Sequence, residues 1–230
     1  PTFSAALRGS SAELREAAAR GLRYLFEKSA TEALTEANMQ GTTGALIRIL
    51  GERTLPSSTR AELLLTVNYM LDRKPESMKK FASGLLTSFI SSILASSKEV
   101  RDAAGSGCVR LISLGLKPEN VLKDLMKGLK DPQNNPDACL AAIATIMNTV
   151  VKDEPPNILP VLREQIENLL NHDTNHIRRA AAKAYAATLR FQAPKVVVVE
   201  VEGLETGENE WARCEANLLV VSHLLRSKQE

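Results

Sequence analysis

Apolar side chains recur at steps of three and four residues along most of the chain, which is the spacing of one face of an α-helix. Residues 96–115 show the pattern most clearly. Ser96 and Glu99 have capping-box spacing, which predicts a helix that starts at Ser96, and Gly115 is expected to end it in the left-handed conformation. Small side chains make up much of the apolar face, which consists of Val100, Ala103, Ala104, Gly107, Cys108, Leu111 and Leu114.

Two glycines lie in the middle of this predicted helix. Gly105 and Gly107 each cost about 1 kcal/mol relative to alanine inside a helix. We therefore expect both glycines to be needed for close packing against another helix.

The same pattern repeats along the chain at intervals near 40 residues. The second helix of each predicted pair has an arginine, or one replacement, near its start, at Arg15, Arg60, Arg101, Ala138, Arg178 and Arg213. Periods of this length with two helices each are typical of HEAT and armadillo repeats, in which each pair buries its apolar face on its neighbours. The predicted fold is therefore all-α: a HEAT/armadillo-type α-solenoid of about six helix pairs, forming one array over residues 1–230.

The predicted helices alternate between first and second members of a pair. The first members are 1–8, 42–50, 77–95, 118–130, 158–170 and 196–199, and the second are 11–28, 58–73, 96–115, 137–151, 174–191 and 211–227. Ser10 and Glu13 repeat the capping-box spacing at the start of 11–28. Residues 196–199 are β-branched and favour a strand locally, but their place in the array predicts a helix.

Composition and charge agree with a helical, soluble protein. Hydrophobic residues make up 44% of the chain but aromatic residues only 4%, and the net charge is +2. Residues 1–115 carry 15 basic and 11 acidic groups, while 116–230 carry 14 and 16, so neither half indicates nucleic-acid binding by charge alone. The chain has no apolar run near the roughly 20 residues of a membrane span and no signal-peptide pattern. We expect a cytoplasmic location without membrane contact, in a fragment of a longer protein.

Few residues offer catalytic or metal-binding chemistry. The common phosphate-binding, dinucleotide-binding and hydrolase motifs are absent, so an enzyme with a small-molecule substrate is not expected. His172, Asp173 and His176 lie within five residues, but Asp173 is explained as a helix N-cap, so no metal or other cofactor is predicted. Asp153 and Glu154 are interpreted as part of a solvated loop. The three cysteines are widely spaced, which predicts reduced, buried thiols.

The predicted inner surface carries a column of arginines at Arg60, Arg101 and Arg178. One interpretation is structural: each guanidinium pairs with an acidic or carbonyl group of the adjacent repeat. The other is functional: exposed members bind carboxylates of a partner. Four further basic residues in neighbouring turns are expected to enlarge such a patch, namely Arg53, Lys79, Lys80 and Lys98.

Residues 44–53, with the sequence GALIRILGER, resemble a signature stretch of a family of very large HEAT-repeat proteins. These proteins sense stalled ribosomes and activate the general amino-acid control kinase, which phosphorylates the alpha subunit of translation initiation factor two. Three further blocks resemble the same family in the same order, at 99–113, 122–132 and 210–211.

The resemblance implies a non-catalytic scaffold that binds the RWD domain at the amino terminus of that kinase and reaches the ribosome through the longer protein. In the family, an arginine in an E-V-R-type motif is important for this contact, and Arg101 matches it by position. The predicted partner-binding residues are Arg101, Arg60, Lys98, Arg53, Lys79 and Lys80.

Two alternative functions stay open from the residues themselves. A ribosome- or RNA-contacting HEAT segment would use the more basic amino-terminal half. A tubulin-binding HEAT module would gather basic and aromatic residues in the turns within each pair. Those turns contain mostly Ser, Pro, Asn and Asp, which argues against tubulin.

Overall fold

The computed structural model describes residues 2–7, 9, 11–29, 35–131, 134, 136–151, 155–191, 218, 220–222 and 224. Within these residues every regular element is a helix, and the chain divides into two compact units, Pro1–Leu116 (unit 1) and Lys117–Glu230 (unit 2). Stacked helix pairs build each unit, which confirms the predicted all-α fold of the HEAT/armadillo solenoid class. Several predicted features lie outside the described residues: the helix at 196–199, most of the helix at 211–227 with Arg213 and Cys214, and Asp153 and Glu154.

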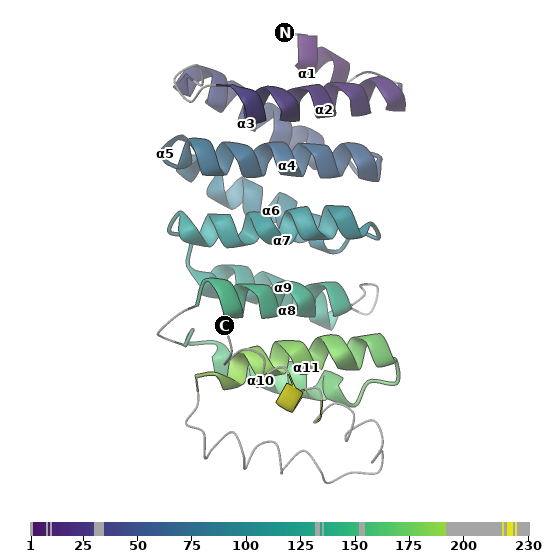
Figure 1. Cartoon of the computed structure of the whole chain (residues 1–230), viewed down its shortest axis with the longest axis vertical. Coiled ribbons are helices and arrows are strands. Elements are labelled where there is room, and N and C mark those ends of the chain that lie inside the picture. The colour runs from purple at the N-terminus through teal and green to yellow at the C-terminus, as the bar shows by residue number, and fades with distance from the viewer. Residues whose placement is uncertain are drawn as a thin grey trace. The chain divides into compact units, whose positions relative to one another are not determined.

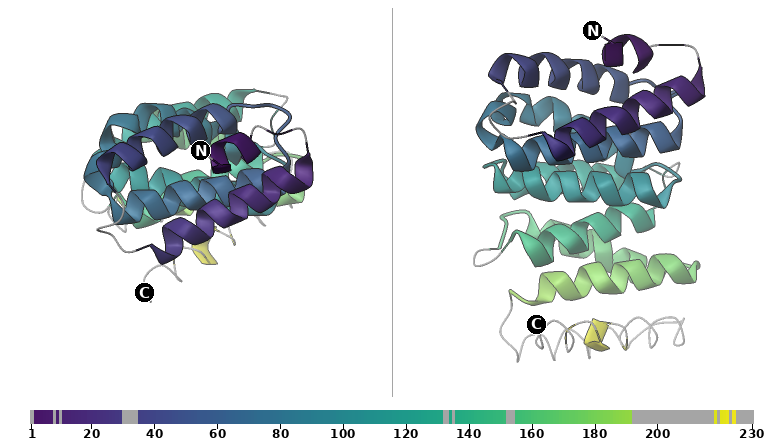
Figure 2. Two further views of the ribbon diagram at one scale, coloured as in Figure 1. Left: turned by 90° about the horizontal axis from the view of Figure 1, so that it is seen from above. Right: turned by 45° about the horizontal axis from the view of Figure 1, so that its top comes forward.

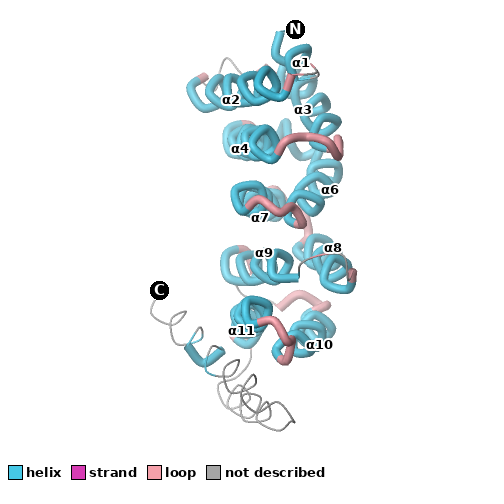
Figure 3. Tube along the Cα trace, turned by 90° about the vertical axis from the view of Figure 1, so that its right-hand side faces the viewer, coloured by secondary structure: helices cyan, strands magenta, loops and turns pink. Residues whose placement is uncertain are grey.

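Unit 1 has two layers of helices (Figures 1 and 3). The inner layer contains α2 (Ala12–Lys28), α4 (Ser57–Arg73) and α7 (Lys98–Ser113), and α4 packs against both others. The outer layer contains α3 (Glu36–Leu50), α5 (Pro75–Met78), a short 3-10 helix η2 (Lys79–Phe81) and α6 (Ala82–Ile93). A short helix α1 (Thr2–Leu7) packs against α2. The view from above in Figure 2 shows the two rows of helices.

In unit 2, the helices of residues 117–191 repeat the arrangement with two pairs. The inner helices α9 (Pro136–Thr149) and α11 (Asn175–Leu189) pack against each other. The outer helices α8 (Pro118–Lys130) and α10 (Leu159–Leu170) each pack against the inner helix of their own pair.

Two predicted helix boundaries in unit 1 are wrong. Helix α3 begins at Glu36 rather than at residue 42, because the Thr35 hydroxyl accepts the Asn38 N–H at 3.4 Å and caps the helix there. The predicted helix 77–95 is divided into α5, η2 and α6. Its first turn begins earlier, at Pro75, whose fixed φ suits a first helical position.

The predicted capping serines are each one residue too early. Helix α7 is capped by Ser97, whose hydroxyl donates to Glu99 at 2.7 Å and accepts the Val100 N–H at 3.4 Å. Ser11 caps α2 with the same geometry. Because the glutamate lies two residues after the serine, the two side chains bond directly instead of forming the reciprocal capping box.

The end of α7 agrees with its prediction. Gly115 has a φ of +102°, the left-handed region that suits glycine. Its N–H donates to Ile112 at 2.9 Å, and the Leu116 N–H donates to Leu111 at 3.1 Å. Together these bonds form a Schellman motif, which satisfies two carbonyl groups at the helix end.

The two glycines inside α7 have different surroundings. A Cβ on Gly107 would lie 2.3 Å from the ring of Phe89 on α6, so this glycine permits the close approach of the two helices. A Cβ on Gly105 would have nothing within 4 Å. The packing prediction is therefore confirmed for Gly107 and wrong for Gly105.

The predicted apolar faces form the core of both units. The α4 stripe is at most 3% exposed, at Leu63, Leu64, Val67, Met70 and Leu71. Cys108 and Cys139 are free and buried, and burial raises the pKa of each thiol to about 12, so both stay protonated and unreactive at neutral pH. In the part of the chain that the structure describes, no helix is both long and apolar enough to cross a membrane.

Candidate partner-binding surface

The predicted arginine column binds the turn within each helix pair. In α7, the Arg101 guanidinium donates to the carbonyl oxygens of Ala95 at 3.1 Å and Ser96 at 2.5 Å. In α11, the Arg178 guanidinium makes the equivalent two bonds, to the carbonyl oxygens of His172 at 2.9 Å and Asp173 at 3.0 Å. These carbonyls follow the end of an outer helix, where backbone acceptors lack helical partners and a cation is favoured.

Arg60 repeats this arrangement on a longer turn. Its guanidinium donates to the carbonyls of Leu50 and Glu52, both at 2.7 Å, and Leu50 is the last residue of α3. Burial lowers the pKa of Arg60, because the turn removes part of its guanidinium from water. We refer to Arg60, Arg101 and Arg178 as the turn arginines.

The hydrogen bonds of Arg60 and Arg101 therefore run within their own helix pairs, where the structural interpretation expected bonds to an adjacent repeat. Each one binds carbonyls of its own pair, because the guanidinium at the start of an inner helix lies next to the turn that precedes it. Charge-assisted bonds of this kind hold the turn in one conformation. The hydrogen bonds of Arg60 and Arg101 direct their guanidinium groups into the turns, so these residues position a surface rather than present a free fork to a partner.

Ion pairs between adjacent repeats do exist in unit 1, where they join α2 to the α3–α4 turn and neighbouring inner helices to each other. Ion pairs join Arg15 to Glu52 and Arg23 to Glu62, and the hydrogen bond to Glu62 raises the pKa of Arg23. Arg110 on α7 contacts Asp72 on α4 at 2.8 Å. These pairs were missed from the sequence, although their separations of 37, 39 and 38 residues match one repeat and are a usable signal.

The turn edge of unit 1 consists of Arg53, Arg60, Lys98 and Arg101, in and after the α3–α4 and α6–α7 turns. Both turns lie at the end of unit 1 opposite α5 in Figure 1. The Lys98 side chain is 75% exposed and pairs with Asp102 one turn further along α7. Arg53 is also exposed. Lys98 and Arg53 are thus the members of the turn edge that solvent and a partner can reach.

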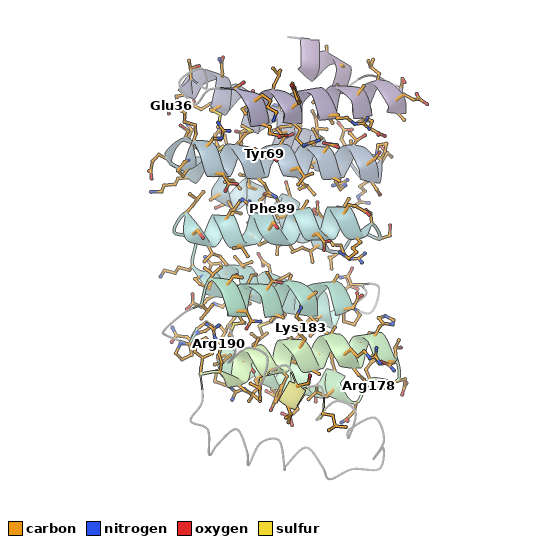
Figure 4. The ribbon with its side chains drawn as sticks, viewed as in Figure 1. Glu36, Tyr69, Phe89, Arg178, Lys183 and Arg190 are labelled. Atoms are coloured by element: carbon orange, nitrogen blue, oxygen red, sulfur yellow. The ribbon has the colours of Figure 1, made fainter. Side chains whose placement is uncertain are left out.

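Lys79 and Lys80 do not belong to this edge, so the expectation that they enlarge it is wrong. They precede α6, whose 12 residues span about 18 Å and separate them from the α6–α7 turn. Lys80 instead lies 3.4 Å from Glu36, which Figure 4 labels at the opposite end of unit 1. Lys79 pairs with Glu76 at 2.9 Å.

The histidine cluster in unit 2 serves the start of α11. His172 Nδ1 accepts the N–H of Thr174 at 3.1 Å, and Thr174 rather than Asp173 is the N-cap residue. The N-cap prediction for Asp173 is therefore wrong. Over the described ranges, no group of three or more His, Cys, Asp or Glu side chains is placed to hold a metal ion.

The chain is similar to parts of very large proteins. It is 29% identical over 233 residues to Protein ILITYHIA of Arabidopsis thaliana, covering 98% of this chain and 8% of that protein. It is 29% identical over 175 residues to the stalled ribosome sensor GCN1 of Mus musculus, covering 75% of this chain and 6% of that protein. It is 25% identical over 189 residues to the eIF-2-alpha kinase activator GCN1 of Dictyostelium discoideum, covering 82% and 7%. No protein-family model matches the chain.

These relatives support a GCN1-like HEAT-repeat protein, and the chain spans less than a tenth of their length. Two solved structures share the fold. A crescerin TOG-domain structure has a TM-score of 0.65 at 17% identity, covering 98% of this chain and 88% of that one. The MAST/Orbit N-terminal domain has a TM-score of 0.70 at 14% identity, covering 99% and 97%. Both likenesses show the solenoid architecture alone.

Proposed function

We propose that the chain is a non-catalytic scaffold module that binds the RWD domain of the general amino-acid control kinase. In this role it couples stalled ribosomes to phosphorylation of translation initiation factor two alpha in the cytoplasm, as one continuous array of repeats. The observation that carries the proposal is the similarity over at least 75% of the chain to proteins named stalled ribosome sensor and eIF-2-alpha kinase activator. A helical-repeat fold, with its extended surfaces, suits such a scaffold.

Within the proposal, the turn edge of unit 1 contacts the RWD domain. Lys98 and Arg53 meet acidic groups of the partner, because they are the exposed cations of the edge. Arg60 and Arg101 act through the turns they hold, so they are positioning residues.

Crosslinking to the purified RWD domain tests the function and the site together. An amine-reactive reagent should link Lys98 to the RWD domain, while Lys79 and Lys80 at the other end of α6 serve as internal comparators. If the two proteins form no complex at all, the RWD function is wrong. If a complex forms but the linked lysines lie away from the turn edge, the function stands and the site assignment is wrong.

Matched charge reversals provide a second test of the site. Lys98→Glu should weaken RWD binding by about tenfold, because the change reverses one exposed charge at the interface. Lys79→Glu makes the same charge change at the other end of α6 and should alter the affinity by less than about twofold. An equal loss for both variants would remove the turn edge from the proposal.

Direct contact with the ribosome is a second candidate function, favoured by the name of the mouse and human relatives. It predicts that the chain binds ribosomal RNA. The logarithm of the association constant should fall steeply with the logarithm of the salt concentration. A flat salt response would exclude this function and leave the RWD proposal unaffected.

A further inference from the structure

Unit 2 has a groove between α8 and α10 that the proposed function does not use. It is open to solvent and has a volume of about 420 Å³. Its lining includes three lysines and three other side chains, namely Lys123, Lys127, Lys130, Asn120, Met126 and Gln165. No residue of the turn edge contributes to it.

The lysines share one face because of the periodicity of α8. The buried face of this helix includes Val121, Leu122, Leu125 and Met126. Asn120, Lys123, Lys127 and Lys130 follow at steps of three and four residues, so they form an exposed stripe along the opposite side. Lys123 and Lys130 are separated by seven residues, which corresponds to about 10.5 Å along the helix axis.

One carboxylate also lines the groove and offsets part of this charge. Asp124 lies 2.7 Å from Lys127, at the (i, i+3) spacing. Among the described residues, Lys123 and Lys130 form no ion pair. Within the described part of the chain, the groove therefore keeps two exposed lysines that form no ion pair, at either end of the lysine stripe.

Gln165 supplies the opposite wall from α10. Its side-chain Oε1 is out of contact with solvent and has no hydrogen-bond partner within the described residues. A buried acceptor without a partner is unfavourable, so an N–H group brought to this wall would be stabilising. Met126, which is 8% exposed, adds an apolar surface beside it.

We propose that this groove binds an extended acidic peptide segment of a partner protein. Carboxylates on one face of the segment pair with Lys123 and Lys130. Same-face positions of an extended chain recur about every 6.8 Å, so the long lysine side chains reach carboxylates two or four residues apart. The covered Gln165 amide turns toward the groove when the segment binds, and a backbone N–H of the segment then supplies the donor that Oε1 lacks.

A nucleic-acid strand fits the groove less well. Among the residues that the structure describes, the lining has no arginine and no aromatic ring on which a base could stack. The Asp124 carboxylate repels phosphates, and phosphate groups offer no hydrogen-bond donor to Gln165. These features favour a peptide, and an RNA probe tests the choice.

Fluorescence anisotropy with the full 230-residue chain tests the proposal without any RWD domain, so its result is independent of the proposed function. The probes are a fluorescein-labelled deca-glutamate peptide and a labelled ten-nucleotide uridine RNA. The variant Lys123→Glu/Lys127→Glu/Lys130→Glu should bind the peptide at least about tenfold more weakly than the parent chain. Lys79→Glu/Lys80→Glu/Lys98→Glu makes the same total charge change in unit 1 and should lose less than about twofold.

Two further variants keep the test decisive. If the triple variant loses its helical circular dichroism, Lys123→Gln/Lys130→Gln replaces it, with an expected loss of about fivefold. Gln165→Leu, which changes no charge, should weaken peptide binding by about threefold. Equal losses in the unit 1 and unit 2 triple variants would show general attraction of polyanions and overturn the proposal. Absence of peptide binding would also overturn it, and RNA binding that only the groove variant abolishes would replace the peptide with a nucleic acid.

Discussion

The described inner helices of unit 1 are linked by several ion pairs, whereas those of unit 2 are richer in buried alanine. In unit 1, charged pairs join neighbouring inner helices, including Arg23 with Glu62 and Arg110 with Asp72. In unit 2, buried alanines line the facing helices α9 and α11, at Ala138, Ala142, Ala144, Ala181, Ala182, Ala184, Ala186 and Ala187. Both units follow the same apolar period, so that period alone does not determine how successive repeats are joined.

The difference has an energetic consequence. Alanine brings two helix backbones close together, so stability in unit 2 depends on the volume of single side chains. Charged pairs at partly exposed positions contribute less, and salt weakens them. The turn arginines, in contrast, occur in both units and should contribute equally to each.

Enlarging a buried alanine in unit 2 should have the largest effect. Ala181 is 0% exposed on α11, so Ala181→Leu is expected to lower the free energy of unfolding by about 3 kcal/mol through overpacking. Ala141 on α9 is exposed, and Ala141→Leu should change the free energy of unfolding by less than about 0.5 kcal/mol. Urea denaturation measures both variants. Equal effects of the two changes would mean that alanine packing does not define unit 2.

The two glycines of α7 test whether unit 1 also contains a site of close packing. Gly107→Ala places a methyl group against the buried Phe89 ring and should cost about 2 kcal/mol. Gly105→Ala meets open space and should raise the free energy of unfolding by up to about 1 kcal/mol. Thermal unfolding of the two variants, measured under the same conditions, gives their midpoint temperatures. If both variants shift the unfolding midpoint in the same direction, this account is contradicted.

Removing a turn arginine should cost the same in each unit. Arg101→Ala and Arg178→Ala each lose two charge-assisted bonds to carbonyls, with an expected loss of about 1 to 2 kcal/mol. Lys98→Ala removes only an exposed pair and should cost less than about 0.5 kcal/mol. Denaturant titration of the three variants compares them, and a negligible loss for either arginine would show that its turn holds without it.

The ion pairs between adjacent repeats of unit 1 should be sensitive to salt. Arg23→Met keeps the aliphatic packing but removes the pairs with Glu62 and Glu27, with an expected loss of about 1 kcal/mol at low ionic strength. The difference from the parent chain should shrink at about 1 M salt, where screening is strong. The same salt series on Ala181→Leu should leave its difference in free energy of unfolding from the parent chain unchanged. If both variants respond to salt in the same way, the two units do not differ as described.

The smallest effect concerns the helix starts of unit 1. The hydroxyl of Ser97 donates to Glu99 and lowers the pKa of that carboxyl below its ordinary 4.5, and Ser11 does the same for Glu13. A lowered pKa in the folded state adds stability above pH 4.5, and this contribution disappears as the pH falls through the lowered value. The unfolding midpoint of Glu99→Gln should therefore approach that of the parent chain in acid. A constant difference at all pH values would contradict the assignment.

The sequence predicted the helices and their buried faces because burial follows directly from the spacing of apolar residues. The α4 stripe and the left-handed Gly115 are examples, since each depends on local pattern and backbone conformation. The start of α3 was placed too late, where Gly41 and Gly44 lower helix propensity, because tertiary packing and the Thr35 cap outweigh propensity there.

The candidate surface could be predicted only in part. Arg101 and Lys98 do share the first turn of α7, as the pattern implied. The sequence could not show that the Arg101 guanidinium binds carbonyls of its own turn, because backbone acceptors look alike at every position. Lys79 and Lys80 were misplaced because a helix of 12 residues separates turns that are close in sequence.

The most direct test of the proposed function compares Arg101→Ala with Arg178→Ala in binding to the RWD domain. Both variants lose the same turn contacts, but only Arg101 belongs to the turn edge. Isothermal titration calorimetry should show that Arg101→Ala weakens the complex by at least about tenfold, which is about 1.4 kcal/mol. Arg178→Ala should remain within about twofold of the parent chain. Equal dissociation constants for the two variants would contradict the assignment of the turn edge of unit 1 as the partner-binding surface.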